Sequence, residues 1–208
     1  WLDGLYFLLG GVEQDTRINA KNPGTYNLTK INSPRFTVNG GWDANTNAGY
    51  LDTGFNPATA AGKFQQNQSC LGVGVLTAVA ANPTIGNTGS GNSFITPRSA
   101  SDTFVGRMSS LGSSNVANTS IGLFTTSRAT SALNRLFKNS GQVLSTAIAS
   151  TTMASANIGI LSDNSGSRYA AGMIVAFAFF GGSLTGRQVL KMYIAYQLYC
   201  AFYGVASA

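Results

Sequence analysis

The apolar residues of this chain fall into many short segments that are separated by turn residues. Residues 34–38 (PRFTV) alternate apolar and polar side chains, as a strand with one exposed face does. Residues 69–77 (SCLGVGVLT) are almost continuously apolar or small, which is typical of a strand buried on both faces. Further strands are expected at 50–55, 104–108, 120–126, 133–137, 142–146, 157–161 and 169–180. This pattern predicts an all-β sandwich.

One helix is strongly indicated, and it lies near the C-terminal end. Thr185 can cap its first turn, and Gln188 stands three residues later, as in a capping box. Gly204 can end it. Apolar residues recur between these limits, at Val189, Met192, Ile194, Ala195, Leu198 and Phe202. The helix is therefore expected to pack against the sandwich.

The first residues of the chain show a different spacing. Trp1, Leu5 and Leu8 lie near helical spacing, which predicts a short N-terminal helical segment. We therefore expect residues 1–33 to form a helical and loop lead-in, and residues 34–208 to form the sandwich with its helix. Trp1 is expected to be an internal start of a longer protein.

Length and composition agree with a single globular domain. The chain has 208 residues, 44% of them hydrophobic and only 10% charged. Its net charge of +6 reflects few acids, and the Lys and Arg residues are spread along the sequence, so nucleic-acid binding is not expected. No apolar run approaches the length of a membrane span, so membrane insertion is not expected either. Cys70 and Cys200 are expected to be buried free thiols, with a disulfide as the alternative.

Candidate chemistry is sparse. The chain has no histidine and only seven acids, whereas glycoside hydrolysis usually needs two carboxylates that flank the scissile bond. We therefore predict no catalytic residue, no cofactor and no metal ion. Asp43, Asn45 and Asn47 have the spacing of part of a calcium loop but lack its remainder, so Asx turns are the favoured interpretation.

Two groups of residues are candidates for binding. The loop of residues 42–50 combines aromatic, amide and carboxylate side chains suited to a sugar, so it is a candidate glycan site; these residues are Trp42, Asp43, Asn45, Asn47 and Tyr50. The alternative is that Trp42 and Tyr50 simply close the edge of the core. The C-terminal helix has more aromatic residues than one face needs, so a candidate subunit interface is assigned to Tyr196, Tyr199, Phe202 and Tyr203.

The C-terminal half resembles a known fold family. A hairpin at 135–144 (RLFKNSGQVL), in which Gly141 can adopt a positive φ, precedes the apolar strand at 169–180 and the segment SLTGRQ at 183–188. This order resembles the concanavalin A-like (laminin G-like) jelly rolls. The resemblance implies a jelly-roll β-sandwich that binds glycans or proteins.

The whole chain also resembles a group of bacteriophage and prophage virion proteins of tail-fibre or capsid-surface type. The most specific segment is YLDTGFNPATAAGKFQQNQSCLGV at 50–73, and SLTGRQVLKMY at 183–193 supports it. The resemblance implies a non-enzymatic protein of the virion surface, made in the bacterial host cytoplasm. It would bind other virion proteins, form a homo-oligomer, with a trimer favoured, and contact host-surface glycan. The alternatives are a purely architectural subunit and a polysaccharide-degrading enzyme that uses Asp52, Asp102 and Asp163.

Overall fold

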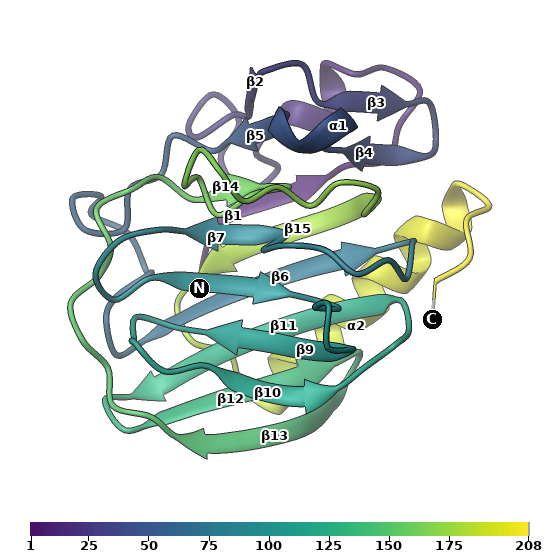
Figure 1. The fold of residues 1–208 in the computed structure, drawn as a ribbon. Coiled ribbons are helices and arrows are strands. Elements are labelled where there is room, and N and C mark those ends of the chain that lie inside the picture. The colour runs from purple at the N-terminus through teal and green to yellow at the C-terminus, as the bar shows by residue number, and fades with distance from the viewer. Residues whose placement is uncertain (208) are drawn as a thin grey trace.

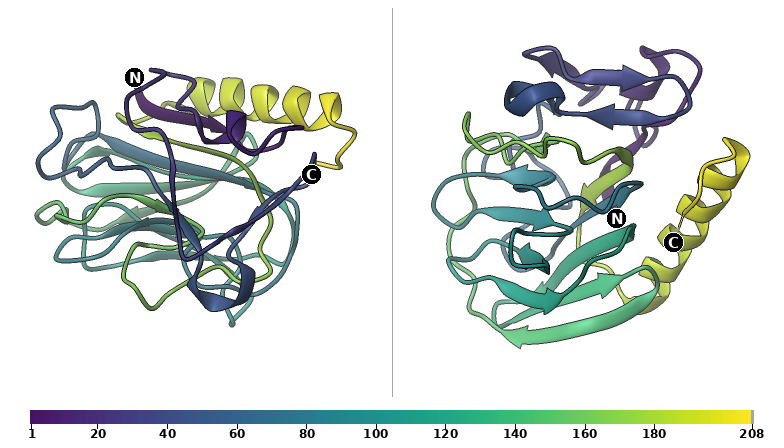
Figure 2. Two further views of the ribbon diagram at one scale, coloured as in Figure 1. Left: turned by 90° about the horizontal axis from the view of Figure 1, so that it is seen from above. Right: turned by 45° about the vertical axis from the view of Figure 1, so that its right-hand side comes forward.

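The computed structural model describes residues 1–207, apart from the side chains of Thr46 and Asn47. Two antiparallel sheets face each other, and a long C-terminal helix covers the outer side of one of them (Figures 1 and 2). We call the sheet that contains residues 69–75 and 175–181 sheet A, and the sheet that contains residues 93–96 and 103–107 sheet B. In Figure 1 sheet B is in front, sheet A lies behind it, and the C-terminal helix lies behind sheet A. The predicted all-β jelly-roll sandwich with a C-terminal helix is confirmed.

Sheet A contains the longer strands of the two sheets. Its strand order is β13-β12-β11-β6-β15-β4-β3, and β1 pairs with β15 beside this path. Its strands are β1 (Leu2–Phe7), β3 (Arg35–Thr37), β4 (Gly41–Asp43), β6 (Ser69–Val75), β11 (Gly122–Thr130), β12 (Leu133–Lys138), β13 (Gly141–Ala147) and β15 (Val175–Gly181).

Sheet B is built from shorter strands in the order β10-β9-β8-β7-β14-β5-β2. These strands are β2 (Thr29–Ile31), β5 (Tyr50–Asp52), β7 (Ile85–Asn87), β8 (Ser93–Thr96), β9 (Thr103–Arg107), β10 (Ser114–Ala117) and β14 (Gly159–Ile160). A 3-10 turn, η1 (Asp15–Arg17), and a short helix, α1 (Asn45–Ala48), lie in the connections.

The central strands of sheet A are buried on both faces, which explains their continuous apolar pattern. Every residue of β6 and β15 is buried. In β15, Ala178 and Phe180 face the core between the sheets, whereas Phe177 and Phe179 face the helix. A strand covered on both sides has no exposed face, so the alternation of apolar and polar residues disappears.

The helix α2 (Gly186–Phe202) begins as the sequence predicts. The Thr185 hydroxyl accepts a hydrogen bond from the Gln188 amide, and the Gln188 side chain accepts one from the Thr185 amide, which completes the capping box. Gly204 follows the helix in the left-handed conformation. The inner face of α2 packs on sheet A through Val189, Met192, Tyr196 and Cys200. Among the described residues, no helix is long and apolar enough to cross a membrane.

The prediction of a short N-terminal helix is wrong. Residues Leu2–Phe7 form β1, which runs antiparallel to β15 with Leu5 opposite Phe179. Buried and half-buried residues alternate along this strand, and this period of two outweighs the helical spacing of three residues. The first 33 residues therefore supply one strand to each sheet, because β2 joins sheet B.

Other boundaries also differ from the prediction. The apolar segment 169–180 is a strand only from Val175, and its first part is a loop. The segment 82–92, where no strand is expected, contains β7. At the 139–141 hairpin, Asn139 rather than Gly141 has the positive φ, of 55°, because Asn tolerates this conformation. The expectation for the cysteines is confirmed, since Cys70 and Cys200 are both free and buried.

Candidate functional site

A surface cavity lies on the outer face of sheet B. Its floor includes Phe94 and Thr96 of β8 and Val105 of β9. These residues point outward because Ile95, which lies between two of them, belongs to the core. We call this cavity, of about 430 Å³, the outer hollow. Its lining residues are Ala80, Ala81, Asn82, Pro83, Phe94, Thr96, Ser99, Ala100, Val105, Arg168, Tyr169 and Ala171.

Hydrogen bonds fix the loops that form the walls of the outer hollow. The Ala81 amide donates to the Arg98 carbonyl at 2.9 Å, which holds the loop before β7 against the β8–β9 turn. On the other wall, the Ser162 hydroxyl donates to the Arg168 carbonyl at 2.8 Å, and the Ala170 amide donates to the Leu161 carbonyl at 2.8 Å. The walls are therefore tied to the sheet before any ligand binds.

Two arginines contact the ring of Phe94: Arg168, which lines the outer hollow, and Arg107, which is not among its lining residues. The guanidinium carbon of Arg168 lies 5.5 Å from the centre of the Phe94 ring, and that of Arg107 lies 5.1 Å from it. Burial, and then the positive charge of Arg168, lower the pKa of Arg107. No acid pairs with Arg107 in the described part of the chain; it donates to Asn92 and to Ser113.

Arg168 keeps capacity for a ligand. Its Nη2 atom forms an ion pair with the fully buried Asp163, and 38% of its side chain is exposed. A guanidinium carries five N–H donors in a planar fork, so one ion pair leaves donors for a second acceptor. The outer hollow therefore combines an apolar floor, hydroxyl and amide side chains, and a partly exposed cation, which is the composition of small-molecule sites.

A second, polar cavity lies on the same side of the molecule, beyond the β8–β9 turn. It has a volume of about 440 Å³. Its lining includes Asp102, Asn118 and Lys138, and the Lys138 ammonium contacts the Ser120 hydroxyl. Asp102 is already paired with Arg98, whose Nε atom lies 2.7 Å from the carboxylate. The turn at 98–102 thus separates two cavities, both rich in hydrogen-bonding groups.

Trp42, the central residue of the predicted glycan loop, is not available to a sugar. It is 0% exposed in β4, packs against Phe36 with a ring separation of 5.2 Å, and donates from its indole to the Thr16 hydroxyl at 2.9 Å. The alternative interpretation, that Trp42 closes the edge of the core, describes this arrangement. Stacking of a sugar on this ring is therefore excluded in this structure.

Asp43 is also occupied by neighbours. Its Oδ2 atom accepts from Arg35 at 2.6 and 2.8 Å, and its Oδ1 atom accepts from the Asn45 amide at 2.6 Å, which is an Asx turn. Asn45 is exposed, and the side chain of Asn47 lies outside the described residues. Tyr50 is half-buried, and its ring centre lies 6.2 Å from that of Tyr169, a lining residue of the outer hollow. A glycan contact by Asn45, Asn47 or Tyr50 stays a prediction.

The predicted subunit-interface residues lie on different sides of α2. Tyr196 is fully buried against sheet A, where its hydroxyl donates to the Val75 carbonyl at 3.3 Å, so it cannot contact another subunit in this structure. Tyr199 packs inward on Phe7. Tyr203 is half-buried, and only Phe202 is strongly exposed. Tyr196 and Tyr199 are therefore explained by the packing of α2 on the sandwich.

The acids that a polysaccharide-degrading enzyme would need are dispersed. Asp52 accepts from the Asn157 amide and from the Gly54 backbone, Asp102 pairs with Arg98, and Asp163 pairs with Arg168. None of them is among the residues that line the outer hollow. Within the described residues, no three His, Cys, Asp or Glu side chains form a group that could hold a metal ion. The geometry of the outer hollow is suited to binding.

Sequence analysis did not find Phe94, Arg107 or Arg168. The only signal for Phe94 was the buried-looking segment SFIT, in which Phe94 and Ile95 cannot both face the core of a strand. Arg168 stands directly before the apolar segment that begins at Tyr169, and the cavity depends on how this segment folds back over sheet B. Such a long-range arrangement leaves no periodic pattern in the sequence.

Comparison with known proteins gives structural neighbours only. No family model matches the chain, and no curated protein matches it in sequence. The ligand-binding domain of botulinum neurotoxin serotype D, in complex with N-acetylneuraminic acid, aligns with a TM-score of 0.60 and 9% identity over 93% of this chain and 50% of that chain. The binding domain of Paraclostridial Mosquitocidal Protein 1 aligns with a TM-score of 0.60 and 13% identity over 93% of this chain and 52% of that chain.

A third neighbour is an enzyme. The sialidase of Trypanosoma rangeli, in complex with sialic acid, aligns with a TM-score of 0.57 and 10% identity over 81% of this chain and 30% of that chain. The chain spans about half the length of the toxin domains and less of the sialidase. At these identities the likeness establishes the fold alone, which is a jelly-roll β-sandwich.

Proposed function

We propose that this chain is a non-catalytic glycan-binding sandwich of a virion surface, and that the outer hollow takes a sugar with an acidic group. The observation that carries this proposal is the pair of guanidiniums over the Phe94 ring. Two cations that share one ring repel each other, and an anion placed beside them relieves that repulsion. The apolar ring and wall residues supply the contact that the uncharged face of a sugar needs.

The structural neighbours support a glycan ligand. One of them was crystallised with N-acetylneuraminic acid and another with sialic acid, and both of these ligands are acidic sugars. The virion location is supported by the sequence resemblance alone. Together these lines favour a module that contacts acidic glycan on a host cell surface.

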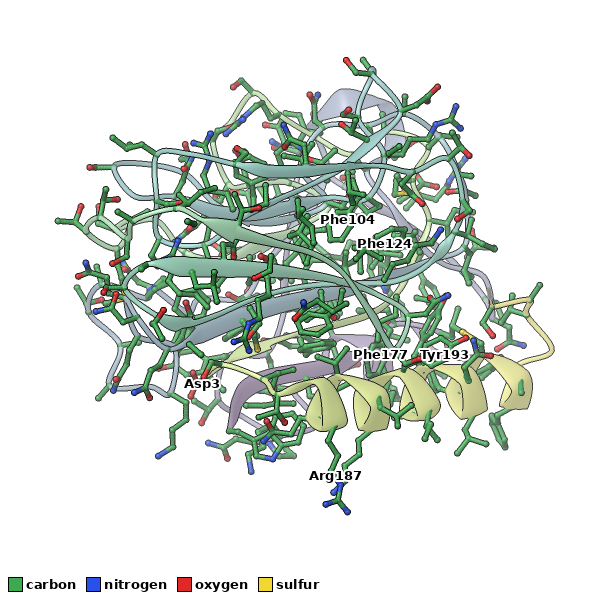
Figure 3. The ribbon with its side chains drawn as sticks, turned by 90° about the horizontal axis from the view of Figure 1, so that it is seen from below. Asp3, Phe104, Phe124, Phe177, Arg187 and Tyr193 are labelled. Atoms are coloured by element: carbon green, nitrogen blue, oxygen red, sulfur yellow. The ribbon has the colours of Figure 1, made fainter. Side chains whose placement is uncertain are left out.

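The experiment uses N-acetylneuraminic acid and a panel of acidic and neutral oligosaccharides as probes. We expect the wild-type protein to bind acidic probes, and Arg168→Gln to weaken this binding at least about tenfold, since a lost charge-assisted hydrogen bond costs about 1.5–3 kcal/mol. Arg187→Gln is the matched control, because Arg187 is an exposed arginine on α2 and lies on the opposite side of the sandwich (Figure 3). If the folded wild-type protein binds no probe, the proposed function is wrong; if Arg168→Gln binds as tightly as wild type, the assigned site is wrong.

The second candidate function is purely architectural, with binding only to other virion proteins. The observation that favours it is the exposed apolar face of α2. Glycan binding and assembly use opposite sides of the molecule, so the two functions are separable by mutation.

A further inference from the structure

The outward face of α2 carries a continuous row of large apolar side chains. Leu190, Ile194, Leu198 and Phe202 are 42%, 48%, 67% and 81% exposed. They are spaced four residues apart, so they form one ridge along the helix surface. Isolated apolar residues on a surface are ordinary, but an aligned row marks an interaction site.

This row is separate from the face that holds the helix to the protein. Val189, Met192, Tyr196 and Cys200 already pack on sheet A. The helix is therefore apolar on two sides, and a helix that only covered one sheet would need only the inner side. Figure 3 shows α2 at the edge of the molecule, with Arg187 pointing away from the body.

The charges of α2 are placed at one end only. Its charged residues are Arg187 and Lys191, both in the first two turns, and it contains no acid. The other end carries Phe202 and is the C-terminal end of the helix dipole, which holds a partial negative charge although the Cys200 and Ala201 carbonyls accept backbone hydrogen bonds there. The outer face thus has a cationic end and an apolar end that attracts cations.

We propose that this face binds the same face of a second copy, with the two helices antiparallel about a two-fold axis. This arrangement places Arg187 and Lys191 of each copy beside Phe202 and the helix C-terminus of the other. A parallel pair or a three-fold bundle would instead bring the cations of all copies together. We therefore propose a dimer, whereas the sequence resemblance implies a trimer, and the experiment below distinguishes the two.

The geometry also limits the strength of this contact. Ridges formed by residues four apart pack best when two helices cross at about 50°. A single crossed helix pair buries less than the roughly 800 Å² per partner of a standard interface. The dimer is accordingly weak and depends on protein concentration.

The dimer has a consequence for glycan binding, which rests on the proposed function. Because α2 covers sheet A and the outer hollow lies on sheet B, the two hollows of a dimer face away from each other (Figure 2). Such a dimer can cross-link two glycan-bearing particles, but its two outer hollows cannot bind the same flat surface at once.

The test is sedimentation equilibrium from about 1 µM to about 1 mM protein, a range that covers weak association. We expect the mean mass of the wild-type protein to rise from monomer toward dimer. Leu198→Glu is expected to stay monomeric. Leu111→Glu is the matched control, because Leu111 lies outside α2 and has the same exposed fraction of 67%. Thermal melting of both variants verifies folding.

The orientation is tested with cysteine cross-linking. A mixture of Arg187→Cys and Phe202→Cys proteins should form mixed disulfide dimers in excess over either self-linked dimer. A monomeric wild-type protein across the whole range, a trimer, or preferential self-linking of Arg187→Cys would each overturn the proposal. None of these readouts depends on a glycan, so failure here is distinguishable from failure of the proposed function.

Discussion

The guanidinium of Arg168 lies over the ring of Phe94, and this contact joins a loop after β14 to the middle of β8. The arginine is also tied to the buried Asp163, so its position is set from both sides. A cation held over an aromatic floor, with donors remaining, is prepared to receive an acceptor group of a ligand without first reorganising. The site therefore depends on the packing of Phe94 as much as on charge.

Filling the outer hollow should abolish binding without unfolding the protein. Ala100 is exposed and lines the hollow, so Ala100→Trp places an indole in the space that a sugar would occupy. We expect loss of glycan binding and a melting temperature within a few degrees of wild type. Ala58→Trp, at an exposed position away from the hollow, should bind normally. Equal binding by both variants would place the ligand elsewhere.

Arg128 should contribute strongly to stability. It is completely buried, and its guanidinium donates to the carbonyls of Met108, Thr130 and Ser131. Arg128→Lys removes the planar fork, so some of these carbonyls lose their donor; we expect a loss of about 2–4 kcal/mol in the free energy of unfolding. Burial also lowers the pKa of Arg128, which agrees with a cation that has no acid partner among the described residues.

Urea unfolding measures this effect. The control is Arg135→Lys, a half-buried arginine on the neighbouring strand β12, which should change the free energy of unfolding by less than about 0.5 kcal/mol. An Arg128→Lys protein as stable as this control would show that the carbonyls find other donors.

The sequence was sufficient for the parts of the fold that depend on local patterns. The capping box at Thr185 and Gln188 needs only neighbouring residues, and it was predicted correctly. The buried character of β6 was also predicted, because a strand covered on both faces has a continuous apolar sequence. The cysteines were predicted to be buried because a free Cys behaves as a small apolar residue.

The parts that failed depend on contacts between distant residues. β1 was expected to be helical because six residues fit either period, and only its pairing with β15 decides between them. Trp42 was a candidate for sugar stacking, but the hydroxyl of Thr16, 26 residues earlier, satisfies its indole in the core. The outer hollow likewise needs Phe94 and Arg168 to meet across the fold. No local sequence pattern encodes contacts between residues so far apart in the chain.

Tyr199 should anchor α2 to the end of β1. Its hydroxyl accepts from the Leu9 amide at 2.6 Å and contacts the Leu9 carbonyl as a donor. Tyr199→Phe removes both contacts and leaves two backbone groups without these partners, so we expect a loss of about 1–3 kcal/mol in chemical unfolding. Tyr203→Phe, on a neighbouring ring 5.3 Å away, should cost less. A larger loss for Tyr203→Phe would contradict this assignment.

The protein should lose stability in alkali because several acidic groups are buried in their neutral form. Burial raises the pKa of Cys200 to about 11, from an ordinary value of 9.0, and burial also raises the pKa values of Cys70, Tyr196 and Tyr199. The folded protein then holds protons that the unfolded chain releases above about pH 9, so these groups stabilise the fold fully below that pH and progressively less as the pH rises through their folded values. Melting temperatures measured from pH 8 to pH 11 should fall steadily, and Cys200→Ala should make the fall less steep.

The burial of the two thiols is tested on the wild-type protein at pH 8. A thiol reagent should leave both cysteines unmodified until urea is added. Rapid modification of the native protein would show that the thiols are accessible to solvent and that burial does not set their pKa values.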